Sequence, residues 1–80
     1  PYIESHIYSP GDQIIGYHEL QAGALVMSRG MSEVLNRGSQ RVLQRLERGD
    51  HFGLLCLFED IKSQHIVMAK TYCEVLLHHN

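Results

Sequence analysis

The side chains best suited to chemistry are six histidines and two cysteines, and their spacing does not indicate a catalytic or metal site. The histidines are His6, His18, His51, His65 and the terminal pair His78-His79. No Cys-x-x-Cys or His-x-x-x-His pair occurs, although such spacings usually supply zinc ligands. A metal-dependent jelly-roll enzyme would need a His-x-His pair with a Glu, which His18-Glu19 does not supply. We therefore predict no metal site.

The two cysteines, Cys56 and Cys73, have apolar neighbours and no adjacent His-Asp arrangement that could activate a nucleophile. They are best interpreted as small buried hydrophobic residues, and two thiols do not make a disulfide framework. This pattern favours a reducing, cytosolic setting and a protein that is not an enzyme. The chain begins with Pro1 and not with Met, which suggests an excised piece of a longer protein.

The charge balance argues against a nucleic-acid-binding role. The 80 residues carry a formal net charge of -2, with 44% hydrophobic and 20% charged residues, which is typical of one globular domain. A group of arginines in the middle of the chain is interleaved with acidic residues, so it is interpreted as a solvated mixed-charge surface. These arginines are Arg37, Arg41, Arg45 and Arg48.

The elements that would position these residues are short and separated by turn signals. Pro10-Gly11-Asp12 marks a turn, and further glycines break the chain at near-regular intervals. Many short apolar or alternating segments between such breaks predict an all-β sandwich or barrel. The expected strands cover 2–8, 13–15, 24–28, 31–35, 41–47, 53–58, 66–70 and 73–77. The segment 41–48 fits a helix as well as a strand, and 54–58 fits a short helical turn.

Five motifs in order resemble the cyclic-nucleotide-binding domain. Tyr8-Ser9-Pro10-Gly11-Asp12-Gln13-Ile14-Ile15 resembles the opening x-x-P-G-D-x-I-I, and Ala24–Leu35 resembles the strands that follow it. Gly49-Asp50-His51-Phe52-Gly53 resembles the G-D-x-F-G entry to the phosphate-binding cassette, and Ala69–Val75 resembles A-x-T-Y-C-x-L. The resemblance implies an antiparallel, jelly-roll-like β-roll over residues 1–80, with a short helical turn in the cassette and with the family's flanking helices largely absent.

One of these motifs, together with a further short segment, resembles animal cation channels. Thr71-Tyr72-Cys73 resembles hyperpolarisation-activated and ether-à-go-go type channels, and Leu55-Cys56-Leu57 resembles the I-C-L of the first group. The resemblance implies a cytosolic regulatory domain of a homotetrameric cell-membrane cation or potassium channel, in which the domain acts on pore-linked helices. The alternative is a functional cAMP or cGMP sensor of a kinase regulatory subunit, a transcription regulator or a membrane exchanger.

The cassette lacks the side chains that hold a cyclic phosphate in this family. The resemblance places the cassette on Phe52, Gly53, Leu54, Leu55, Cys56, Lys62, Ser63 and Gln64. Leu54 stands where the family has the ribose-binding Glu, and Ser63 stands where it has the phosphate-binding Arg. Lys62 could supply charge, but as a flexible donor without the guanidinium fork. Losing both contacts removes roughly 3–6 kcal/mol, or about two to four decades of affinity. We therefore expect weak or no binding of cAMP or cGMP and no other cofactor.

Overall fold

The computed structural model describes residues 2–14, 23–53 and 64–79, and the regular structure in these ranges is entirely β-strand. No helix in these ranges could cross a membrane. The predicted cassette helix falls on residues outside the described ranges. The strands are β1 (Tyr2–Tyr8), β2 (Ala24–Arg29), β3 (Met31–Asn36), β4 (Val42–Glu47), β5 (His51–Gly53), β6 (His65–Ala69) and β7 (Cys73–His79).

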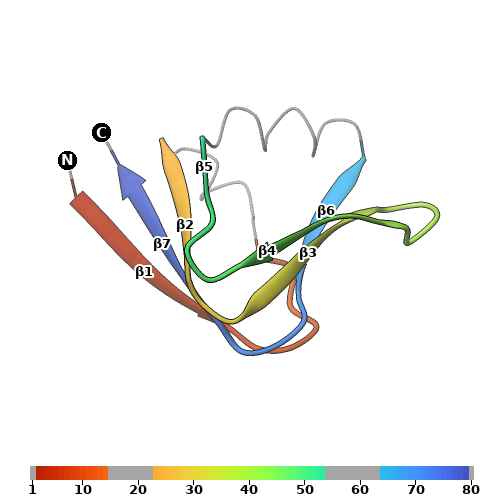
Figure 1. Ribbon diagram of the computed structural model, residues 1–80, viewed down its shortest axis with the longest axis horizontal. Helices are drawn as coiled ribbons and strands as arrows, with labels where there is room; N and C mark the ends of the chain where they lie inside the picture. The colour runs from red at the N-terminus through yellow and green to blue at the C-terminus, as the bar shows by residue number, and fades with distance from the viewer. Residues whose placement is uncertain (1, 15–22, 54–63, 80) are drawn as a thin grey trace.

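The strands form two antiparallel sheets that face each other (Figure 1). One sheet has the order β1-β7-β2-β5, and the other has the order β4-β3-β6, to which Gln13 adds a single bridge to Met68. The chain passes from one sheet to the other after β2, β4 and β6 through short connections, and again between β5 and β6. This arrangement confirms the predicted all-β, antiparallel roll.

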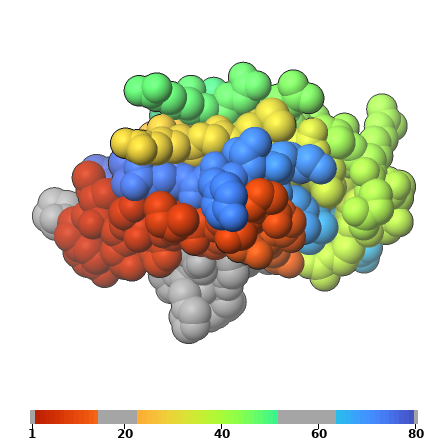
Figure 2. Space-filling view, turned by 90° about the horizontal axis from the view of Figure 1, so that it is seen from below, coloured from red at the N-terminus to blue at the C-terminus, as the bar shows by residue number. Residues whose placement is uncertain are grey.

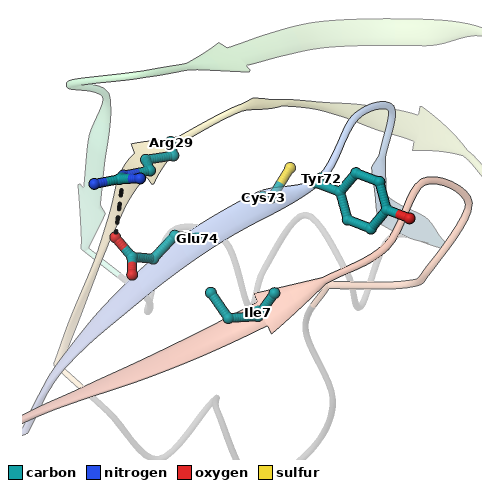
Figure 3. A pocket seen from close by; sticks show the side chains of 5 residues that line it. All are labelled: Ile7, Arg29, Tyr72, Cys73 and Glu74. Carbon is teal, nitrogen blue, oxygen red and sulfur yellow. Dashed lines mark ion pairs between the residues drawn. The ribbon is translucent and has the colours of Figure 1, made fainter.

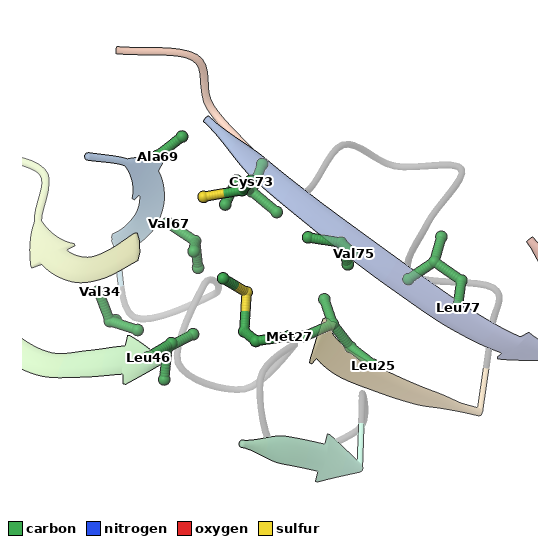
Figure 4. Close-up of a cluster of buried hydrophobic side chains, with 10 residues drawn as sticks. Leu25, Met27, Val34, Leu46, Val67, Ala69, Cys73, Val75 and Leu77 are labelled. Carbon is green, nitrogen blue, oxygen red and sulfur yellow. The ribbon is translucent and has the colours of Figure 1, made fainter. Parts of the chain in front are cut away.

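The core lies between the two sheets and follows the period-two alternation of the strands. Leu25 and Met27 of β2 and Val75 and Leu77 of β7 point inward from the four-stranded sheet, and Val34, Leu46, Val67 and Ala69 meet them from the other sheet (Figure 4). Ile14 and the free Cys73 complete the cluster, so the prediction of a buried Cys73 is confirmed. Burying each large aliphatic side chain contributes about 1.5–3 kcal/mol.

The ambiguous segment 41–48 forms strand β4, which pairs with β3. Of its three aliphatic residues, Val42 and Leu43 are about half exposed and only Leu46 is fully buried. The hydrophobic periodicity of this segment therefore does not distinguish a helix from a strand, because a single inward-facing residue fits both. The strand conformation is supported by pairing, with Leu46 opposite Ser32 and Arg45 opposite Glu33.

Two connections between the sheets, from β2 to β3 and from β6 to β7, meet at one corner of the roll. Met31 N donates to Thr71 Oγ1 over 3.0 Å, and the Cys73 thiol donates to Met31 O over 3.2 Å. Lys70 N also donates to Met31 O, over 2.9 Å. Thr71 and Cys73 thus satisfy backbone groups at a strand crossing, where an unpaired polar group is costly.

Candidate functional site

The predicted cassette joins the two sheets. Its entry, Phe52-Gly53, ends β5 in the four-stranded sheet, where Phe52 pairs with Leu25 and Gly53 with Ala24. Its exit, Gln64, precedes β6 in the three-stranded sheet, where His65 pairs with Asn36. The two ends of the cassette therefore belong to different sheets.

Only part of the predicted site falls on described residues. Phe52 and Gly53 are placed in β5, and Gln64 is exposed beside β6. The remaining predicted site residues lie outside the described ranges; they are Leu54, Leu55, Cys56, Lys62 and Ser63. The structure thus places the two ends of the cassette, and the loss of its charged groups remains a prediction from sequence.

The exit of the cassette is tied to the hairpin between β3 and β4. Gln64 adopts a left-handed backbone conformation, with φ of 68°, and its carbonyl oxygen accepts a hydrogen bond from Arg37 N over 2.8 Å. The hairpin is itself held by Asn36, whose Oδ1 accepts from the N–H groups of Gly38 and Ser39, each over 3.0 Å. Sequence reasoning missed this contact, because a backbone hydrogen bond leaves no mark on residue type.

His65, the first residue of β6, is partly buried. It lies two residues before the buried Val67, on the same side of β6, and Val67 is followed on that side by the buried Ala69. Its Nδ1 is buried and has no hydrogen-bond partner among the described residues. An imidazole nitrogen in this state is available to hydrogen-bond a further polar group.

A hollow lies on the outer surface, and none of the cassette residues lines it. It has a volume of about 150 Å³ and is lined by Ile7, Arg29, Tyr72, Cys73 and Glu74 (Figure 3). Arg29 is the only cation among these lining residues, and its Nε lies 3.9 Å from Glu74 Oε1, so its charge is already balanced. Typical ligand pockets enclose about 300–1,000 Å³. The hollow lies at the opposite end of β2 from Ala24, which pairs with Gly53. We therefore assign it no ligand.

The comparisons with known proteins identify kinase regulatory subunits and not channels. No family model matches the chain. The chain is 32% identical over 73 residues, 91% of its length, to cAMP-dependent protein kinase regulatory subunits of Yarrowia lipolytica and Eremothecium gossypii. It spans only 20% and 16% of those two proteins. Among solved structures, it matches the regulatory subunit of a cAMP-independent protein kinase A from Trypanosoma brucei with 25% identity and a TM-score of 0.70. That match covers 95% of this chain and 29% of the other.

The fold and these matches together define the chain as a cyclic-nucleotide-binding-type domain, a regulatory module. Its curated relatives are regulatory subunits of cAMP-dependent protein kinases, which favours the alternative interpretation over the channel. The structure gives the channel-like motif Thr71-Tyr72-Cys73 a role in the fold. Thr71 and Cys73 bond the backbone at Met31, and Tyr72 is 71% exposed at the turn. Thr71 and Cys73 thus stabilise the corner of the roll through hydrogen bonds to the backbone. The fold uses these contacts whether or not the domain is linked to a pore.

Proposed function

We propose that this chain is a regulatory module of a protein kinase regulatory subunit and that it responds weakly or not at all to cAMP. The observation that carries the first part is the 32% identity, over 91% of the chain, to two such subunits. By analogy with those proteins, the partner of the whole molecule would be a kinase catalytic subunit.

The second part rests on the residues at the cassette. Leu54 and Ser63 supply neither the carboxylate nor the guanidinium that a ribose and a cyclic phosphate require. The Trypanosoma brucei protein that this chain matches is described as part of a cAMP-independent kinase. A variant of that protein, in which one substitution introduces an arginine and two introduce alanine, is described as bound to cAMP in its A site. This comparison supports a pocket whose architecture is retained and whose charged contacts decide the affinity.

Restoring the missing groups tests this proposal. The family resemblance places an alanine at His65, so this residue is changed as well. We expect the triple variant Leu54→Glu, Ser63→Arg, His65→Ala to bind cAMP at least about a hundredfold more tightly than the unmodified chain in isothermal titration calorimetry. The unmodified chain should show no micromolar binding of cAMP or cGMP. A micromolar dissociation constant for the unmodified chain would overturn the weak-binding proposal.

A matched control separates charge from hydrogen-bond geometry. The triple variant with Ser63→Lys in place of Ser63→Arg adds the same charge without the planar fork, so its gain in cAMP affinity should be markedly smaller. The kinase assignment is tested separately by immobilising the chain and measuring retention of a purified catalytic subunit of a cAMP-dependent protein kinase. No retention by the chain or by the longer protein that contains it would contradict that assignment.

A further inference from the structure

Strand β1 leaves one edge of the four-stranded sheet without a strand neighbour among the described residues. Within these ranges it pairs only with β7, over seven consecutive residue pairs and without a bulge. Three of its side chains are large, hydrophobic and mostly exposed, with exposed fractions of 60% for Tyr2, 61% for Ile3 and 68% for Ile7. Figure 2 shows β1 (red) as a continuous row in full view, beside the rows of β7 and β2.

The other edges of the described sheets carry features that discourage pairing, whereas β1 carries a single formal charge, on Glu4. Natural edge strands are usually shortened, bulged, or marked with lysine, charge or proline, because an open edge pairs readily with another chain. β5 has three residues, β4 has a register shift and carries Arg45, and β6 already receives the bridge from Gln13. Between Tyr2 and Tyr8 the sequence contains no Pro, Lys or Arg. Among the residues that the structure describes, nothing therefore occupies the β1 edge, which could accept a further strand.

The sequence of β1 reads as a palindrome of side-chain types around Ser5. Tyr2-Ile3-Glu4-Ser5-His6-Ile7-Tyr8 has the same chemical order in both directions, except that Glu4 is matched by His6, its potential counter-ion. In an antiparallel pair of two copies centred on Ser5, Ile3 would face Ile7 of the second copy, and Glu4 would face His6. Directly opposed residues of antiparallel strands lie about 4.5–5.5 Å apart and stabilise the pair when they are apolar or oppositely charged.

The faces of the strand agree with this register. Ile3, Ser5 and Ile7 lie on the outer side of the sheet, because their partners on β7 alternate with the buried Val75 and Leu77. Glu4 and His6 lie on the opposite side, where Glu4 Oε2 is 3.2 Å from His6 Nε2 and Glu4 Oε1 is 2.7 Å from His79 Nε2. His79 Nε2 makes no directed hydrogen bond within the described ranges, so this contact is electrostatic. In the paired copies, Glu4 would lie on the same face of the joined sheet as His6 of the second copy. The two side chains could therefore contact each other directly.

We propose that two copies of this chain pair through β1, antiparallel and centred on Ser5, so that two four-stranded sheets continue as one. A two-fold axis would pass between the two Ser5 residues, as the symmetry of a closed dimer requires. Four isoleucines would then form one apolar strip on the outer face, and two Glu4–His6 pairs would set the register. We name a second copy of this chain as the partner because the side chains of β1 complement those of the same strand when it runs in the opposite direction.

Cysteine cross-linking tests the register. With Cys56 replaced by serine in every variant, Ser5→Cys should form an intermolecular disulfide under mild oxidation, because the two thiols face each other across the axis. The matched variant Ile7→Cys should not, since its two thiols would be roughly 14 Å apart along the strands. Equal cross-linking of both variants, or none in Ser5→Cys, would overturn the proposed pairing.

Charge exchange tests the contacts that set the register, by sedimentation of the unmodified chain and of three variants. His6→Glu should weaken self-association by about tenfold, because it opposes two carboxylates in both symmetric pairs. The double exchange Glu4→His, His6→Glu should restore the original association. Arg48→Glu, in an exposed turn away from β1, should leave it unchanged. Circular dichroism of each variant confirms that the roll is folded. An unmodified chain that stays monomeric at the highest concentrations, or a double exchange that fails to recover while folded, would contradict the proposal.

Discussion

Gly30 and Tyr72 are in contact at the corner of the roll, where the carbonyl oxygen of Tyr72 fills the place that a side chain on Gly30 would occupy. Gly30 has φ of +85°, in the left-handed region that favours glycine. A Cβ there would also lie 2.8 Å from Thr71 Oγ1 and 3.0 Å from Cys73 Cα. The crossing from β2 to β3 can thus approach the β6–β7 turn only because residue 30 has no side chain.

Gly30→Ala should therefore lower the free energy of unfolding by on the order of 3 kcal/mol or more, from the left-handed backbone and the clash together. Gly49→Ala is the matched control, since Gly49 has φ of +94° but no described atom within 4 Å of the position that the alanine methyl would take. It should cost only about 1 kcal/mol, the backbone contribution alone. Urea unfolding of both variants measures the difference. Similar losses for the two would show that the contact with Tyr72 contributes nothing.

Thr71→Val should destabilise the same corner by about 1 kcal/mol, because it removes the acceptor of the Met31 N–H while keeping the shape of the side chain. Thr71→Ser keeps the hydroxyl and should recover most of that loss. Thermal unfolding of the three proteins provides the comparison. If the serine variant were as unstable as the valine variant, the methyl group and not the hydrogen bond would be the stabilising element.

Leu46→Ala should destabilise the fold by about 2–5 kcal/mol, because Leu46 is fully buried and is the inward-facing aliphatic residue of β4. Leu43→Ala, at a position that is 46% exposed on the same strand, should cost less than about 1 kcal/mol. Chemical denaturation would measure both. A comparable loss at Leu43 would contradict the assignment of Leu46 as the residue that anchors β4.

Glu33→Gln should lower the unfolding free energy by about 1 kcal/mol at low ionic strength. The Glu33 side chain is mostly buried on β3, with Lys70 Nζ at 3.6 Å and an Arg45 nitrogen at 3.9 Å, and both cations are about half exposed and so partly screened. The difference from the unmodified chain should therefore shrink in concentrated NaCl. Glu47→Gln is the control on the exposed part of β4 and should have little effect. A loss that does not change with salt would indicate packing and not charge.

The roll can be predicted from the sequence because a glycine follows each of β1 to β4 within three residues and the inward residues are mostly aliphatic. The predicted bounds of β1 equal the observed ones, and the predicted β7 begins at Cys73 but ends two residues before the observed strand. By contrast, the predicted strand 53–58 begins two residues after the observed start of β5, and its residues 54–58 lie outside the described ranges. The conformation of 41–48 depends on pairing with β3, which a local pattern does not contain.

The candidate site is less accessible to sequence reasoning than the fold. Residue types at Leu54 and Ser63 show which charges the cassette lacks. They do not show that Gln64 is bound through its backbone to Arg37, or that the Nδ1 of His65 has no partner among the described residues. The palindrome of β1 is visible in the sequence, yet it gains meaning only when β1 is found at a sheet edge.

The hydrogen bond from Arg37 N to Gln64 O makes the amide of Arg37 a natural probe of movement at the cassette exit. An amide hydrogen that is held in this way is protected from exchange with solvent until the bond opens. Any event that displaces Gln64 must either carry the β3–β4 hairpin with it or expose the amide of Arg37. The deuterium uptake of this one amide would thus signal a change at the cassette exit before any ligand is known.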